Sequence, residues 1–244
     1  MCYAMGNAIR LLKTKISHVS LEMSDKEASE FVCDFIDTFI HERIHIAEVA
    51  VLRIGRRHIQ DGDSILTYGQ HRLVRKLLER SWSEGVKFSV TVLDDPFDPT
   101  GAELVERLTG LGVDVTYSPN LSGLTYHLRR SNKVLLGTEA VFANGALYAP
   151  VGTSDIALAA TALRKHVFAL CESINIDRDR VATDSTTYNE IDPGRCSADS
   201  FRLLFDTTRD AYVSGLITEY EESSGKTPSL SVQALLRTKE EITA

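Results

Sequence analysis

A regular alternation of apolar runs and helical segments after residue 61 constrains the fold of this chain more than any other feature. Five runs rich in apolar and β-branched residues have the length of buried strands, and they cover residues 64–68, 86–94, 113–117, 133–137 and 167–171. Helical spacing of apolar residues lies between them, in residues 70–84, 99–111, 122–130 and 153–164. This alternation predicts an α/β fold, a Rossmann-like parallel sheet with helices on both faces. Its contacts are expected at the carboxyl ends of the strands.

The N-terminal part of the chain is helical throughout. Apolar residues recur at intervals of three and four in residues 7–19, which predicts a short amphipathic helix. Ser24 and Glu27 match a capping box at the start of a second helix, which we expect to extend to Gln60 with a bend near Gly55. The sequence therefore predicts two parts, an N-terminal helical region (residues 1–60) and a Rossmann-like α/β domain (residues 61–244).

The composition of the chain limits the classes of partner and the cellular compartment that we expect. The net charge of −7 comes from interspersed acidic and basic residues without a basic block, which argues against nucleic acid as a partner. The cysteines Cys2, Cys33, Cys171 and Cys196 are scattered and form no C-x-x-C pair, so neither a zinc-thiolate site nor a disulfide framework is predicted. No signal peptide is recognisable, and no segment approaches the roughly 20 apolar residues that span a bilayer. We therefore expect a cytoplasmic protein without a membrane partner.

Residues 41–45 spell H-E-R-I-H, a pattern in which two histidines on one helical face bind zinc and the glutamate orients a water molecule. The third ligand is missing, because Glu48 and Val51 occupy the positions where such proteases have glycine and histidine. His58 lies on the same predicted helix, more than three turns away, too far to share the metal. We interpret the motif as a solvated strip of an amphipathic helix and predict no metal site.

Gly225-Lys226-Thr227 is similar to the end of a phosphate-binding loop. The glycine that such a loop needs five residues earlier is replaced by Tyr220, and the segment follows a helix where the mechanism requires a strand. The G-x-G-x-x-G pattern of dinucleotide-binding folds is missing from the sequence. We therefore predict no nucleotide cofactor.

The segment from residue 134 to residue 154 is more informative. Asn144-Gly145 is typical of a tight turn with positive φ. Gly152-Thr153 is typical of the start of a helix, whose free backbone amides can hold an anion. From these residues alone the segment either forms only turns and a helix start or also binds an anion, and both interpretations remain open.

Seven segments of the chain, spread over nearly its whole length, carry a family resemblance. They are MGNAIRLLK (5–13), FIDTFIHERI (35–44), DGDSILTYG (61–69), EGVKFSVTVLDD (84–95), NKVLLGTEAVFANG (132–145), VGT (151–153) and TDSTTYNE (183–190). In this order they resemble the family that joins the alpha, beta and delta regulatory subunits of translation initiation factor 2B to the methylthioribose-phosphate and ribose-bisphosphate isomerases. The first, second and last segments are most similar to the delta subunit.

The resemblance identifies positions where the isomerases carry chemical groups. Moving hydrogen between adjacent sugar carbons requires an acid and a base close to the substrate. Where the isomerases have a cysteine, an aspartate and a lysine, this chain has Gly69, Ala146 and Pro150. None of these residues can transfer a proton or neutralise a phosphate. The resemblance therefore implies a pocket without catalytic residues, the vestigial pocket, composed of Gly69, Asn144, Gly145, Ala146, Gly152 and Thr153.

For function, the resemblance implies a non-catalytic regulatory subunit, similar to delta, of the guanine-nucleotide exchange factor for translation initiation factor 2. The implied partners are the alpha, beta, gamma and epsilon subunits of factor 2B, and factor 2 itself with a phosphorylated alpha subunit. A phosphoserine is read by basic side chains. The candidates, which are equally well interpreted as solvated helix surface, are Arg10, Lys13, Lys15, Arg53, Arg56 and Arg57.

The alternative function is a sugar-phosphate isomerase that interconverts an aldose and a ketose, acting on methylthioribose-1-phosphate or ribose-1,5-bisphosphate. Its catalytic groups would then have moved to other pocket residues. The candidates for that role are Asp94, Asp95, Glu139 and Asn144.

Overall fold

The computed structural model describes residues 2–20, 22–195 and 201–220. Its centre is a six-stranded parallel sheet with the strand order β3-β2-β1-β4-β7-β9. The strands are β1 (Asp63–Tyr68), β2 (Phe88–Leu93), β3 (Asp114–Ser118), β4 (Lys133–Gly137), β7 (His166–Leu170) and β9 (Gly215–Ile217). The first five confirm the strands predicted from the apolar runs. The sixth, β9, was not predicted, because three residues are too few to show a pattern.

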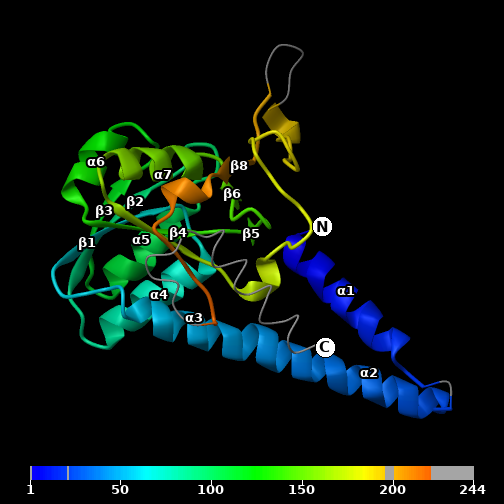
Figure 1. Ribbon diagram of the computed structural model, residues 1–244. Helices are drawn as coiled ribbons and strands as arrows, with labels where there is room; N and C mark the ends of the chain where they lie inside the picture. The colour runs from blue at the N-terminus through cyan, green and yellow to red at the C-terminus, as the bar shows by residue number, and fades with distance from the viewer. Residues whose placement is uncertain (1, 21, 196–200, 221–244) are drawn as a thin grey trace.

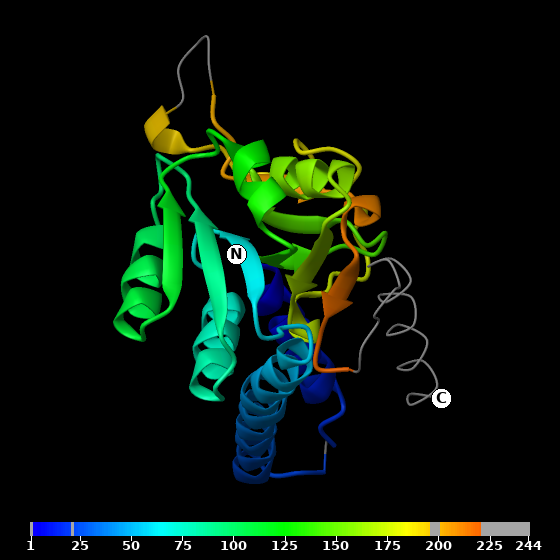
Figure 2. The same cartoon turned by 90° about the vertical axis from the view of Figure 1, so that its left-hand side faces the viewer.

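Helices lie on both faces of this sheet, as predicted (Figure 2). They are α4 (Arg72–Ser83), α5 (Gly101–Gly110), α6 (Leu124–Arg130) and α7 (Thr153–Ala162). Side chains of α4 and α5 bury against one face of the sheet, and side chains of α6 and α7 bury against the other. The predicted α/β fold class is thus confirmed.

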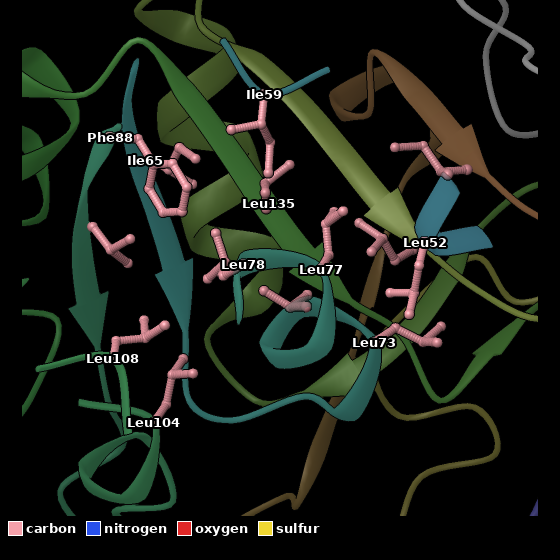
Figure 3. Close-up of a cluster of buried hydrophobic side chains, with 14 of the residues drawn as sticks. Leu52, Ile59, Ile65, Leu73, Leu77, Leu78, Phe88, Leu104, Leu108 and Leu135 are labelled. Carbon is pink, nitrogen blue, oxygen red and sulfur yellow. The ribbon is translucent and has the colours of Figure 1, made fainter. Parts of the chain in front are cut away.

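The larger core lies under α4 and α5. Figure 3 shows Leu77 and Leu78 of α4 near Leu135 and Ile65 of the sheet, with Leu73 beside Leu52. Helix α3 (Ala47–Arg56) also contributes to this core with its own buried apolar side chains, Val51, Leu52 and Ile54. The C-terminal part of the helical region therefore packs as part of the sheet's own core. The predicted boundary at residue 60 stays a prediction.

The second predicted helix is divided into α2 (Asp25–Ile40), a π-helical segment and α3, and it ends at Arg56 instead of Gln60. The amides of residues 57–59 bond to carbonyl oxygens only three positions back, which tightens the chain into a turn. The backbone amide of Gln60 then donates to Asp63 Oδ2 at 2.7 Å, so that it leaves the helical pattern. Gly55 lies inside α3, where an added Cβ would be 2.9 Å from Leu77 Cδ2.

Helices α1 (Tyr3–Ser17) and α2 (Asp25–Ile40) form an arm that projects from the sheet domain (Figure 1). The predicted capping box is confirmed at the start of α2, where the Ser24 side chain accepts from the amide of Glu27 and the Glu27 side chain accepts from the amide of Ser24. Neither helix has a buried residue. Between α2 and α3 the chain forms a π-helical segment, η1 (His41–Ile46).

A second, smaller sheet is antiparallel and has the strand order β5-β6-β8. Its strands are β5 (Ala140–Val141), β6 (Leu147–Pro150) and β8 (Phe205–Thr208). The turn between β5 and β6 contains Gly145, whose φ of 80° confirms the predicted positive φ. Short 3-10 helices are found at η2 (Ser173–Asn175), η3 (Pro193–Arg195) and η4 (Asp210–Tyr212).

Candidate functional site

The loop after β1 carries the first residue of the vestigial pocket. Gly69 has a φ of 54°, and an added Cβ would lie 3.0 Å from Thr100 Oγ1. Asp94, at the end of the neighbouring strand, is fully buried and accepts a hydrogen bond of 2.9 Å from Tyr117 Oη. Burial raises the pKa of the Asp94 carboxyl. The backbone of Gly69 is left-handed, so a side chain at this position would be strained.

The start of α7 carries the second group of residues. Gly152 precedes the helix with a φ of 102°, and Thr153 opens it, which confirms the predicted helix start. The backbone amides of Gly152 and Ser154 both donate to Asp206 Oδ2, at 2.8 and 2.9 Å. Burial, together with a smaller effect of the nearby Asp155, raises the pKa of Asp206 to about 7, although the two amide hydrogen bonds oppose the shift.

Tyr68 brings these two groups together. Its hydroxyl donates a hydrogen bond of 2.6 Å to the carbonyl oxygen of Val151, and an added Cβ on Gly152 would lie 2.9 Å from the same hydroxyl oxygen. Burial raises the pKa of the Tyr68 phenol. Because Tyr68 directly precedes Gly69, the end of β1 and the start of α7 are in contact.

The remaining residues of the vestigial pocket lie in a different environment. Asn144 Nδ2 donates to the carbonyl oxygen of Ala182 at 2.7 Å, within the turn that also holds Gly145. Ala146 is only 3% exposed and belongs to an apolar cluster with Phe142 and Tyr148. A carboxylate at position 146 would be placed in this largely aromatic cluster. The structure therefore joins Gly69 to Gly152 and Thr153 and packs the Asn144 turn into an aromatic cluster.

Two potentially reactive side chains lie at the same edge of the sheet, one of them fully buried and the other partly buried. Cys171 follows β7 with no exposure, and burial raises the pKa of its thiol. His71 packs against Gly137, where an added Cβ would lie 1.9 Å from the imidazole Cγ. Burial lowers the pKa of His71 to about 4, so this imidazole is neutral at physiological pH.

Two salt bridges that the sequence did not predict lie at the edge of the sheet where the strands have their carboxyl ends. Arg202 bonds to Asp95, in the loop after β2, and also to Asp192 at 3.1 Å. All three side chains are less than one-fifth exposed. The guanidinium also lies over the ring of Phe97. No motif surrounds Arg202 in the sequence, and its partner Asp95 is 107 positions away.

The segment after β7 contacts both the arm and the helices of the sheet domain. Asn7 of α1 donates to the carbonyl oxygens of Ile174 and Ile176, at 2.7 and 3.0 Å. On the other side, Arg72 of α4 bonds both to Glu48 of α3 and to Glu172. The N-terminal MGNAIR segment therefore has a structural role in holding this segment.

The basic residues considered as phosphate readers are in part engaged within the chain. Arg10 bonds to Asp179 on the segment after β7. Lys15 lies 4.6 Å from the centre of the Phe31 ring, and Arg56 bonds to Glu84 at 3.1 Å. These contacts do not test a role in reading phosphoserine, which stays a prediction.

The H-E-R-I-H motif forms the π-helical segment, and His41, Glu42 and His45 are all exposed there. In the described part of the chain, no three His, Cys, Asp or Glu side chains are grouped closely enough to hold a metal ion. Among these residues there is also no helix with the length and apolar character needed to cross a bilayer. Cys196 and the segment Gly225-Lys226-Thr227 lie outside the described residues.

Known proteins with a similar sequence and fold support one family. Over 191 residues the chain is 38% identical to translation initiation factor eIF2B subunit delta of Schizosaccharomyces pombe, a match that covers 78% of this chain and 40% of that protein. It also matches a chain of the tetrameric eIF2B-beta2-delta2 complex from C. thermophilum with a TM-score of 0.87 and 52% identity, covering 90% of this chain and 70% of the other. The chain thus spans less than half the length of its S. pombe relative.

A more distant similarity extends to an enzyme. The chain is 24% identical over 216 residues to ribose 1,5-bisphosphate isomerase of Methanocaldococcus jannaschii, covering 85% of this chain and 70% of the enzyme. Residues 1–220 match the initiation factor 2 subunit family. Together with the parallel sheet and its flanking helices, this match shows that the chain belongs to the initiation factor 2 subunit family.

Proposed function

We propose that this chain acts as a non-catalytic regulatory subunit, of the delta type, in the guanine-nucleotide exchange factor for translation initiation factor 2. The observation that carries the proposal is the 52% identity, over 90% of the chain, to a chain of an eIF2B-beta2-delta2 complex. Identity to the isomerase relative is much lower, at 24%. The chain is therefore more similar to the assembly subunits than to the enzymes of the family.

The chemistry of the pocket supports the same proposal. Gly69, Ala146 and Pro150 stand where the resemblance places the groups that act on a sugar phosphate. Gly69 has no side chain and Ala146 has no ionisable group, so neither can exchange a proton with a substrate. Pro150 is exposed and brings neither a positive charge nor a backbone N–H to that position.

The proposed partners are the other subunits of factor 2B, namely alpha, beta, gamma and epsilon, and factor 2 with its phosphorylated alpha subunit. The tetrameric relative contains both beta and delta subunits, which makes beta the first partner to test. The proposed location is the cytoplasm, where initiation factors act.

The partner proposal is tested by purification of the tagged chain from its own cells under native conditions, with identification of the bound proteins by mass spectrometry. We expect the beta subunit in stoichiometric amounts, together with further subunits of factor 2B. A matched bait is the same chain with the arm anchor weakened by Asn7→Ala, which reports whether the arm contributes to assembly. Recovery of a stable monomer without these subunits would contradict the proposal.

The alternative, an isomerase with relocated catalytic groups, is favoured by one observation. The buried Asp94 has a raised pKa, which is a property that general acids need. Against this role, its carboxyl accepts the Tyr117 hydroxyl and borders Gly101, where an added Cβ would lie 2.9 Å from Asp94 Oδ2. A turnover assay on ribose-1,5-bisphosphate and methylthioribose-1-phosphate separates the two functions, and the proposed function predicts no conversion.

A further inference from the structure

The start of α7 has the geometry of an anion-binding site that a side chain of the same molecule occupies. Two backbone amides, those of Gly152 and Ser154, point at the same oxygen, Asp206 Oδ2. The N-terminus of a helix carries partial positive charge and unpaired N–H groups, so it attracts anions, phosphate among them. Helix α7 has ten residues, long enough for this effect.

The small antiparallel sheet delivers Asp206 to this position. Strand β6 runs directly into the start of α7, and β8 pairs with β6 so that Asp206 lies opposite Ala149. The amide of Val151 also donates to the carbonyl oxygen of Leu204 at 3.0 Å, which extends the pairing up to the helix. The backbone thus fixes the Asp206 carboxyl over the helix start.

The contact of Asp206 with the start of α7 differs from an ordinary helix cap, because its second carboxyl oxygen is buried and unpaired within the part of the chain that the structure describes. Asp206 is only 6% exposed, and its Oδ1 has no hydrogen-bond partner among the described residues. An ordinary cap is the residue that directly precedes the helix, whereas Asp206 reaches the helix start from strand β8, 54 positions later. Burying an unpaired carboxyl oxygen costs free energy. The helix start therefore holds an acidic group from another strand, and one of its two carboxyl oxygens has no partner in the described ranges of the chain.

The space around the helix start is closed on the opposite side. An added Cβ on Gly152 would lie 2.9 Å from Tyr68 Oη and 3.0 Å from Leu121 Cδ1. An external anion could therefore reach the two amides only by taking the place of the Asp206 carboxyl. Asp206 occupies the two amides, and Tyr68 and Leu121 border the helix start next to Gly152.

We propose that the Asp206 carboxyl is an internal substitute for a phosphate group, which keeps phosphorylated small molecules away from the start of α7. Removal of the carboxyl opens a site for inorganic phosphate at the amides of Gly152 and Ser154. This proposal concerns the chemistry of the site and stands independently of the subunit assignment.

The test uses the full chain labelled with ¹⁵N and titrated with inorganic phosphate at constant ionic strength. Asp206→Gly removes the carboxyl, and Asp155→Asn is a matched control that removes an exposed carboxylate from the first turn of α7. In Asp206→Gly we expect saturable shifts of the Gly152 and Ser154 amide signals. Its dissociation constant for phosphate should be lower than in wild type by roughly tenfold or more, because two charge-assisted hydrogen bonds become available. Over the phosphate concentrations that saturate Asp206→Gly, wild type and Asp155→Asn should show no saturable shift at these two amides.

Two results would overturn the proposal. One is a saturable shift of the Gly152 and Ser154 signals in wild type, and the other is a folded Asp206→Gly variant whose two amides ignore phosphate. If Asp206→Gly does not fold, a pH titration of wild type and Asp206→Asn decides. The same two amide signals should titrate together in wild type and stay constant in Asp206→Asn. Constant signals in wild type would show that the carboxyl does not occupy the amides.

Discussion

The side-chain amide of Asn7 donates a hydrogen bond of 2.7 Å to the carbonyl oxygen of Ile174, 167 positions later in the chain. A second bond reaches Ile176 at 3.0 Å, so one side chain satisfies two carbonyl groups. This contact fixes the first helix of the arm to the segment that follows β7.

Asn7→Ala should lower the free energy of unfolding by about 1–2 kcal/mol, because two partly buried carbonyl groups lose their donor. Lys13→Ala on the exposed side of the same helix is the control and should change stability by less than about 0.5 kcal/mol. Urea unfolding followed by circular dichroism measures both. Equal stability of the two variants would show that the anchor contributes nothing.

Gly137→Ala should destabilise the fold by about 3 kcal/mol or more, because the new methyl group would overlap the base of the partly buried His71 side chain. The added Cβ would lie 1.9 Å from His71 Cγ and 2.3 Å from His71 Cβ, and rotation about χ1 of His71 does not move its Cβ away. Gly110→Ala is the matched control, since nothing lies within 4 Å of its added Cβ. Thermal unfolding compares the two. A Gly137→Ala protein as stable as wild type would mean that His71 does not pack there.

The ion bridge between Arg202 and Asp95 should show measurable coupling. In a double-mutant cycle with Arg202→Ala and Asp95→Ala, we expect a coupling free energy of about 1–3 kcal/mol, because both side chains are largely shielded from water. The exposed pair of Arg107 and Glu103 within α5 should show a much smaller coupling. Additive effects of Arg202→Ala and Asp95→Ala would contradict the bridge.

Stability should depend on pH through Asp206. Its pKa rises from 3.8 to about 7 in the folded chain, so folding favours the protonated carboxyl. The resulting stabilisation is complete below pH 3.8 and is lost as the pH rises through about 7. The charged groups that face it are Asp155 on α7 and, through the Tyr68 phenol of β1, the acidic residues Asp94 and Asp95.

Asp206→Asn removes this titration. The free energy of unfolding of wild type, measured relative to that of the variant, should fall by roughly 2–4 kcal/mol between pH 4 and pH 8. Guanidinium unfolding at a series of pH values gives this difference directly. Parallel pH profiles of the two proteins would show that Asp206 has an ordinary pKa in the fold.

The main sheet could be predicted because its strands are apolar runs of five or more residues with helical segments between them. The capping box at Ser24 and the turn at Gly145 were predictable for a related reason, since each depends on residues within a few positions. Strands β8 and β9 have four and three residues and carry no comparable pattern.

The candidate site was predictable only in part. The start of α7 at Gly152 is a local feature, and the sequence left open whether it is only a helix start or also an anion site. What fills that start is Asp206, 54 positions away, and its placement depends on the pairing of β8 with β6. Position 146 was assigned to the pocket by resemblance, yet its burial among aromatic rings follows from tertiary packing that residue spacing does not reveal.

The segment that follows β7 is bound on two sides, by Asn7 of α1 and, through Glu172 and Arg72, by Glu48 of α3. Helix α2 continues through η1 into α3, so both ends of the arm are attached to the sheet domain. A macromolecule that binds the outer ends of α1 and α2 would therefore be linked to the sheet domain through both attachments.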